Sequence, residues 1–275
     1  MTFRSKVKLG FSWVSQSYYL FKQHPAKWLA LSSMYLFVFQ LFPIVLLGLI
    51  ENINQNHGSV LVLFLVGFIG LALTFSWPVF TSFIIGVCRE TDANRTTSMG
   101  VVFNRVKPHI HQLIFLGVAF FLYRILMVGM FETEIQSLDM QRLDKEMMPI
   151  GFWWLMLKVL LLQIPLLLAT WYSPLLISYH QYSLFKSVYH SIWAALHNIV
   201  SLITAWLVLT VGVAAMMLVL GIFVGIFALV SKGLAASLGM LLLIFASLIA
   251  IAFLFSIQYF SFMAMYYKDG EDFVS

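Results

Sequence analysis

Long apolar segments alternate with short polar segments along this chain of 275 residues. Six of the apolar segments carry almost no charge, and nearly every charged residue falls between them. Each is as long as the roughly 20 residues that an α-helix needs to cross a hydrocarbon core about 30 Å thick. The pattern predicts an all-α fold, a polytopic transmembrane helical bundle. Its spans are expected at residues 29–49, 60–86, 113–131, 153–177, 199–230 and 234–267.

A different pattern, with apolar residues at helical spacing and basic or polar residues between them, precedes spans one, three and five. It predicts three cytoplasmic interfacial amphipathic helices, each leading into one span. Whether this arrangement reflects an internal duplication is left open, because any span entering from that side can follow such a helix. The apolar series are Phe3, Val7, Phe11, Val14, Tyr18 and Phe21; Met99, Val102, Phe103 and Val106; and Leu184, Val188, Ile192 and Ala195. The expected breaks are at His24-Pro25, Lys107-Pro108-His109 and His197-Asn198.

Composition supports the membrane assignment. Charged residues make up 10% of the chain, hydrophobic residues 61%, and mean hydropathy is +0.94, which excludes a water-soluble fold. Continuous apolar runs of this length also exclude a transmembrane barrel, whose strands are short and alternate in polarity. We expect one transmembrane domain over residues 1–275, with an amphipathic helix at 1–27, the bundle at 28–267 and a cytoplasmic tail at 268–275.

Lysine and arginine set the expected orientation. They concentrate before span one and in the loop after span two, whereas the loop after span three is mainly acidic. The positive-inside rule therefore places both termini and the loops after spans two and four in the cytoplasm. The net charge of +5 is better explained by contact with anionic membrane lipids than by nucleic-acid binding.

Two basic residues lie within predicted spans. Arg124 falls in the outer half of span three, where an unpaired charge costs about 2.5–3.5 kcal/mol. We expect Glu132 or Glu134 to pair with it. Lys158, near the outer end of span four, has a stem long enough to reach the interface. The alternative for both residues is a site for an anion or a lipid headgroup.

Four histidines, His24, His109, His111 and His197, are candidate interfacial residues, and three of them mark the expected helix breaks. Since His109 and His111 form the only close pair, hydrogen bonding at helix ends near headgroups is a better interpretation than metal binding. The single cysteine, Cys88, permits no intrachain disulfide. No cofactor is expected. The chain has no zinc, nucleophile-turn or phosphate-loop motif of a membrane enzyme, so we do not predict an enzyme.

The last two spans are joined by residues 231–233 alone, which predicts an antiparallel hairpin. Small residues let transmembrane helices approach closely. Gly212, Gly221 and Gly225 are therefore expected to pack inside this hairpin, although the same pattern would also suit a homodimer face.

Several aromatic, proline and glycine positions resemble a family of uncharacterised bacterial inner-membrane proteins. The N-terminal set is similar to the family segment W-x-x-x-G-x-x-L-F-x-x-x-P-x-x-W, with Ser17 at the glycine position, and Ser173 stands at a usual alanine. The resemblance implies a membrane fold and a location in the bacterial inner (cytoplasmic) membrane, and no mechanism. The residues concerned are Trp13, Leu20, Phe21, Pro25 and Trp28; Phe42, Pro43 and Gly48; and Tyr172, Ser173, Pro174, Leu175, Leu176, Ser191, Ala195 and Asn198.

Two functions suit these features. The first is a non-enzymatic integral membrane protein that organises the envelope, with interfacial helices that dock on anionic lipid or on a membrane-protein partner. The second is a small-solute or lipid transporter, a permease that uses a cleft among proline-kinked spans with Arg124 as an anion contact. The sequence gives no substrate and no oligomeric state.

The orientation is testable by cysteine labelling of intact cells with an impermeant reagent. In a Cys88→Ser background, Ser137→Cys should react from outside, because it lies in the acidic loop expected there, residues 132–149. Ser98→Cys should react only after the membrane is opened. Labelling of Ser98→Cys but not Ser137→Cys from outside would invert the topology.

Overall fold

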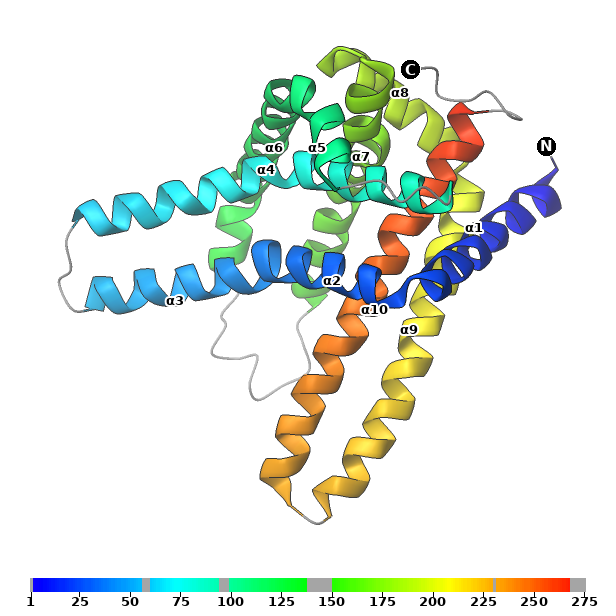
Figure 1. The fold of residues 1–275 in the computed structure, drawn as a ribbon. Coiled ribbons are helices and arrows are strands. Elements are labelled where there is room, and N and C mark those ends of the chain that lie inside the picture. The colour runs from blue at the N-terminus through cyan, green and yellow to red at the C-terminus, as the bar shows by residue number, and fades with distance from the viewer. Residues whose placement is uncertain (1, 56–59, 94–98, 138–149, 230, 268–275) are drawn as a thin grey trace.

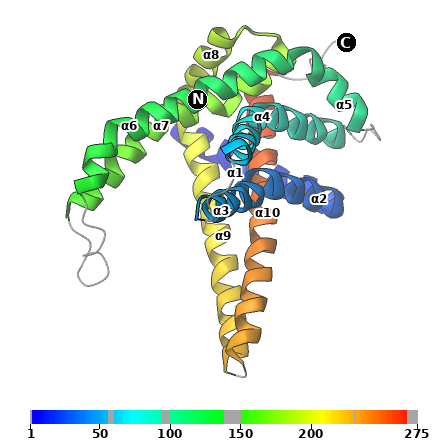
Figure 2. The ribbon, with the colours of Figure 1, turned by 90° about the vertical axis from the view of Figure 1, so that its left-hand side faces the viewer.

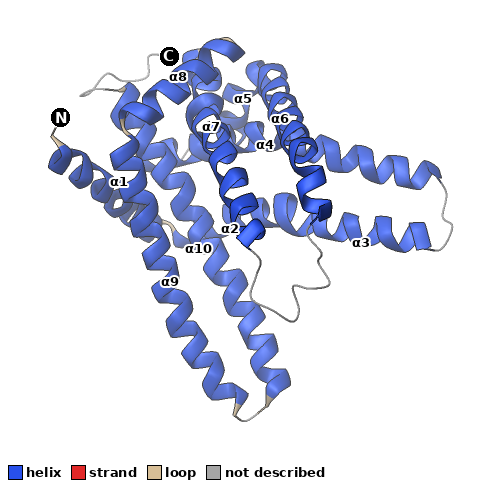
Figure 3. Cartoon of the chain, turned by 180° about the vertical axis from the view of Figure 1, so that it is seen from behind, coloured by secondary structure: helices blue, strands red, loops and turns tan. Residues whose placement is uncertain are grey.

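The computed structural model describes residues 2–55, 60–93, 99–137, 150–229 and 231–267, and within these ranges it contains helices and no strand (Figure 3). The C-terminal tail, residue 98 and most of the acidic loop lie outside the described residues. In chain order the elements are α1 (Phe3–Gln23), α2 (Pro25–Leu36), a π-helical turn η1 (Phe37–Leu41), α3 (Phe42–Gln55), α4 (Val60–Asp92), α5 (Met99–Val106), a 3₁₀ turn η2 (Lys107–His109), α6 (Ile110–Ser137), α7 (Ile150–His180), α8 (Leu184–His197), α9 (Ile199–Ala228) and α10 (Lys232–Tyr266).

The predicted fold class is confirmed. The described part of the chain has six helical segments long and apolar enough to cross a membrane, and each contains one predicted span or nearly all of it. Span one is built from α2, η1 and α3, which follow one another without a loop. The six segments are Pro25–Glu51, Phe64–Asp92, Met99–Glu134, Phe152–His180, Ile199–Ala228 and Lys232–Tyr266.

The three amphipathic helices are also present, as α1, α5 and α8. Each ends where the sequence predicts a break. His24 has non-helical backbone angles between α1 and α2, Pro108 lies in η2, and Asn198 separates α8 from α9. Trp28 Nε1 donates a hydrogen bond to the carbonyl of Leu20, at 3.1 Å, across the first break.

The spans form three hairpins that diverge from a common core (Figure 1). The first consists of α2, η1 and α3 against α4, the second of α6 and α7, and the third of α9 and α10. Figure 2, viewed at 90°, shows the second and third hairpins pointing in different directions while the first points toward the viewer. The amphipathic helices and the described chain ends lie at the core, away from the hairpin tips.

The C-terminal half of α10 is the centre of the core. It packs against α1, α2, α4 and α7, and residues 255–262 are all buried. The large core cluster includes Trp13, Trp28, Tyr172 and Ala195. These residues are among those that carry the resemblance described above. In this structure they pack in the core.

Side chains of two other helices bind the backbone of α7 in this core. The Tyr172 N–H donates to Ser191 Oγ of α8 at 3.0 Å, and Ser191 Oγ donates to the Leu168 carbonyl at 2.7 Å. Gln258 Nε2 of α10 donates to the neighbouring Trp171 carbonyl. Two other helices therefore supply polar partners to α7 at a fully buried point.

The last turn of α4 has polar contacts with three further helices. Glu90, only 3% exposed, forms an ion pair with Arg105 of α5. Lys27 of α2 donates to Thr91 Oγ1 at 2.9 Å, and Tyr259 of α10 donates to an Asp92 carboxylate oxygen at 2.9 Å. These bonds fix the first hairpin to the core.

Glycine permits two close helix contacts. A Cβ atom at Gly10 of α1 would lie 2.5 Å from the Ser201 carbonyl of α9, and one at Gly117 of α6 would lie 2.5 Å from the Phe75 carbonyl of α4. The last two spans form the expected antiparallel hairpin, but the expected packing of its glycines was wrong. Gly212, Gly221 and Gly225 have open space where a Cβ would be, so α9 does not turn them toward α10.

Helix α1 has an exposed face and a buried face. Of the predicted apolar series, Phe3, Phe11 and Tyr18 are exposed, as required for a surface that lies on lipid, whereas Val14 and Phe21 pack against the core cluster. The sequence did not identify the adjoining face, where Gly10 and Trp13 are buried against α9 and α10. This second face explains why α1 is part of the core.

The bridge through Ser191 can be tested by stability. Ser191→Ala removes one hydrogen bond each from a buried N–H and a buried carbonyl of α7, and we expect a loss of about 1–3 kcal/mol. Ser187→Ala is the matched control, because Ser187 is equally buried on α8 but its hydroxyl bonds only to Leu184 of its own helix. Thermal unfolding in one detergent should show the larger loss for Ser191→Ala; equal losses would contradict the bridge.

Candidate functional site: a polar cleft between the first two hairpins

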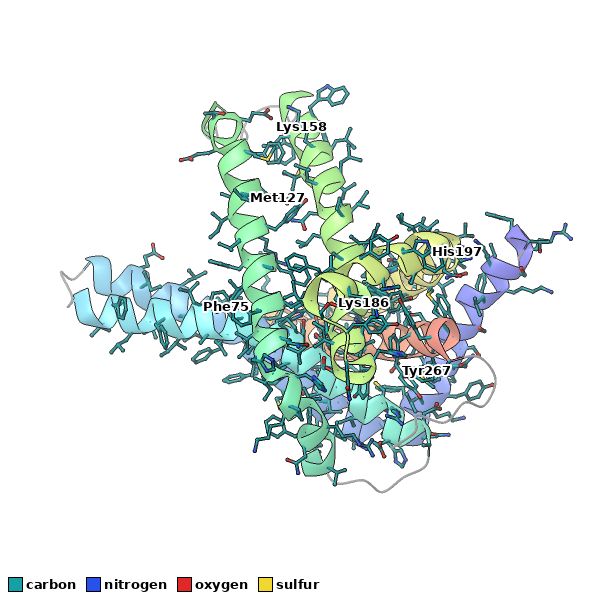
Figure 4. The ribbon with its side chains drawn as sticks, turned by 90° about the horizontal axis from the view of Figure 1, so that it is seen from above. Phe75, Met127, Lys158, Lys186, His197 and Tyr267 are labelled. Carbon is teal, nitrogen blue, oxygen red and sulfur yellow. The ribbon has the colours of Figure 1, made fainter. Side chains whose placement is uncertain are left out.

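A cleft of about 620 Å³ opens between the first and second hairpins. Its walls come from α2 with η1, from α4, from α6 and from α7. Figure 4 shows Phe75 where α4 crosses α6, next to this cleft. Apolar lining is supplied mainly by phenylalanine and leucine. The polar lining residues are Tyr35, Gln40, Thr74, Trp77, Arg124, Gln163 and Thr170.

The cleft lies deep within the helices. Thr74, Arg124 and Gln163 are each near the middle of α4, α6 and α7, about 20 Å from the helix ends at 1.5 Å per residue. Gln40 lies in η1, midway along span one. A cleft at this position in membrane-crossing helices is surrounded by the hydrocarbon region rather than by headgroups.

Arg124 is the only charged residue that lines the cleft among the residues described, and no carboxylate lines it. An arginine at this depth is costly in hydrocarbon, and such residues normally face a polar cavity or a partner. The neighbouring Gln and Thr groups provide the polar surroundings, but they do not neutralise the charge. The cleft is therefore positively charged.

Prolines interrupt the backbone of two cleft helices. A proline has no N–H to donate to the carbonyl four residues earlier. Pro78 therefore releases the Thr74 carbonyl in α4, and Pro174 releases the Thr170 carbonyl in α7. Both threonines line the cleft, so their backbone acceptors are released beside it.

Span one is interrupted in a related way. Pro43 cannot donate to the carbonyl of Phe39, and the π-helical turn η1 immediately precedes it, with the Phe42 N–H donating to the Phe37 carbonyl. Phe39 and Gln40 of this turn line the cleft. Single π turns within α-helices frequently occur at functional sites.

Hydrogen bonds join the cleft walls. Trp77 Nε1 donates to the Tyr35 hydroxyl at 3.0 Å, which links α4 to α2. Tyr123, next to Arg124, donates to the Leu162 carbonyl at 2.8 Å, which links α6 to α7. The cleft is thus a built feature of four connected helices.

The predicted partner of Arg124 needs correction. Glu134 pairs instead with Lys158, whose Nζ lies 2.8 Å from one carboxylate oxygen. Glu132 is exposed near the same end of α6, about 12 Å along the helix from Arg124. No ion pair of Arg124 is found with a described carboxylate. Lys158 thus joins α6 to α7 near the end of α6 and the beginning of α7, and Figure 4 shows it there.

The candidate histidines are at helix junctions, and they do not meet in one site. His24 and His111 are exposed, His109 is half-buried in η2, and the His197 ring stacks on Trp193 with ring centres 5.4 Å apart. The His197 carbonyl accepts a hydrogen bond from Lys6. Among the described residues no three His, Cys, Asp or Glu side chains could hold a metal ion, and Cys88 is buried with a free thiol.

Sequence reasoning found Arg124 but missed most of the cleft. Gln40 and Gln163 were detectable as neutral polar residues at the centres of spans one and four. A Thr-x-x-x-Pro pattern also occurs twice, at 74–78 and 170–174, and both threonines line the cleft. The sequence does not show which spans pack against one another.

Comparisons with protein-family models, with curated proteins and with solved structures found no match. The resemblance to bacterial inner-membrane proteins therefore stays a prediction. The fold itself defines the class: a polytopic α-helical membrane protein with a positively charged cleft among its spans.

Double-mutant cycles can separate the two basic residues. Lys158→Gln and Glu134→Gln should be coupled by about 0.2–1 kcal/mol in thermal unfolding in nanodiscs, because the pair is half-exposed. Arg124→Gln and Glu134→Gln should be additive. Coupling between Arg124 and Glu134 with none at Lys158 would restore the original pairing.

Proposed function

We propose that this protein is a lipid-handling membrane protein, a permease that binds an amphipathic anion in the cleft between its first two hairpins. The observation that carries the proposal is Arg124, a charged residue that faces a cleft without a carboxylate. A cation held in that position favours a phosphate or carboxylate group, because a charge-assisted hydrogen bond is about twice as strong as a neutral one.

The other residues that line the cleft suit the uncharged polar groups and the apolar part of an amphipathic ligand. Gln40, Gln163, Thr74 and Thr170 can donate to or accept from ester and hydroxyl groups. Phenylalanine and leucine side chains supply the apolar part of the wall. The cleft is partly open rather than enclosed, so a lipid can enter sideways from the bilayer.

Interrupted helices support handling as well as binding. Transporters often build their sites from helices broken near the bilayer midplane, where released backbone groups contact the substrate. Three of the four spans that form the cleft contain a helix-interrupting proline: Pro43 in span one, Pro78 in α4 and Pro174 in α7. These helices can therefore bend at the cleft without breaking further hydrogen bonds.

A second candidate, membrane organisation, is supported by α1. Phe3, Phe11 and Tyr18 are exposed together, with Arg4 and Lys8 exposed nearby. An amphipathic basic surface of this kind suits anionic lipid.

The proposal also includes a location in the bacterial inner membrane, with both termini in the cytoplasm. It involves no covalent chemistry.

The proposal predicts preferential binding of an anionic phospholipid. The full-length protein in detergent should bind short-chain phosphatidylglycerol more tightly than phosphatidylcholine, as measured by native mass spectrometry. Arg124→Gln should weaken phosphatidylglycerol binding about ten- to hundredfold, the loss expected for one charged hydrogen bond. Arg124→Lys should retain part of the preference.

Lys158→Gln is the matched control, because it removes the same charge from the neighbouring helix but lies outside the cleft. It should bind phosphatidylglycerol as the parent does. Equal binding of the two lipids by the parent protein, or equal losses in Arg124→Gln and Lys158→Gln, would refute the proposal.

A further inference from the structure

A second, smaller groove of about 230 Å³ lies between α7 and α9. Its floor is Trp171 and Leu202, both buried, and its exposed edges include Ile203 and Leu207. Of the described residues that line it, all are leucine, isoleucine or tryptophan except Thr210. A groove of this composition suits a hydrocarbon chain and offers nothing to a charged group.

The floor of this groove is held in place by α10. Trp171 Nε1 donates to Ser261 Oγ at 3.3 Å, and the Trp171 carbonyl accepts from Gln258. The Trp171 and Trp206 rings lie against each other with centres 5.5 Å apart. The groove is therefore formed before any ligand arrives.

The groove and the charged cleft share one lining residue. Leu167 of α7 lines both, with Gln163 and Thr170 on the cleft side and Leu168 and Trp171 on the groove side. Leu167 is 47% exposed, so it forms a low ridge between them. A molecule lying across this ridge would place a polar end near Arg124 and an apolar end on the two tryptophans.

From this shared residue we infer that the groove binds an acyl chain of the same anionic lipid whose headgroup lies at Arg124. The inference rests on the proposed function and adds a binding place for the acyl chain of the ligand. It makes α7 the shared wall of a two-part site, with the headgroup on the α6 side and the chain on the α9 side. The ligand class is thus a phospholipid or fatty acyl anion rather than a small soluble anion.

The test uses tryptophan fluorescence, since Trp171 and Trp206 lie in the groove and bromine on an acyl chain quenches tryptophan on contact. The full-length protein is placed in phosphatidylcholine nanodiscs that contain a minor fraction of chain-brominated lipid. Brominated phosphatidylglycerol should quench more than brominated phosphatidylcholine at the same fraction. Arg124→Gln should remove this excess, because the headgroup no longer holds the lipid there.

Two α9 variants locate the chain. Ile203→Phe narrows the groove and should remove most of the excess quenching, whereas Val211→Phe, at an exposed position outside the groove, should retain it. The native-mass-spectrometry preference for phosphatidylglycerol reports on the headgroup alone. If that preference persists but the excess quenching is absent, or if both phenylalanine variants behave alike, the groove assignment is overturned and the proposed function stands. If the preference itself is absent, the proposed function fails.

Discussion

The arrangement around α7 depends on polar contacts to its backbone where no water reaches. Between Leu168 and Pro174 this backbone lies in an apolar interior, where each unsatisfied polar group would cost several kcal/mol, an order-of-magnitude figure. Ser191 of α8 and Gln258 of α10 contribute side-chain hydrogen bonds to this stretch. The polar partners fix where α8 and α10 must lie, and the aromatic core then packs around them.

The same stretch of α7 shapes both candidate subsites. It presents Thr170 to the charged cleft and Trp171 to the apolar groove. Adjacent residues on a helix point about 100° apart, so one short segment can serve two compartments. Because Gln258 and Ser261 of α10 both contact Trp171, the position of the groove depends on the core rather than on the lipid-facing surface.

The sequence predicted what depends on composition and local chemistry. Spans follow from the cost of transferring residues into hydrocarbon, and the break at Pro25 follows from the missing N–H of proline. Arg124 was recognisable for the same reason. Its environment was not, since pairing it with Glu134 considered only one helix, and the competing Lys158 belongs to another. The buried face of α1 at Gly10 and the open glycines of α9 likewise depend on which helices meet.

The three hairpins diverge from one core, so their tips lie farther apart from one another than their bases do (Figures 1 and 2). In a bilayer crossed by all three hairpins, the leaflet at the tips would have to accommodate a wider outline than the leaflet at the core. Lipids around such a wedge would pack with least strain where the bilayer bends to match it. In that case the energy of the protein in the membrane would depend on curvature, in addition to thickness and charge.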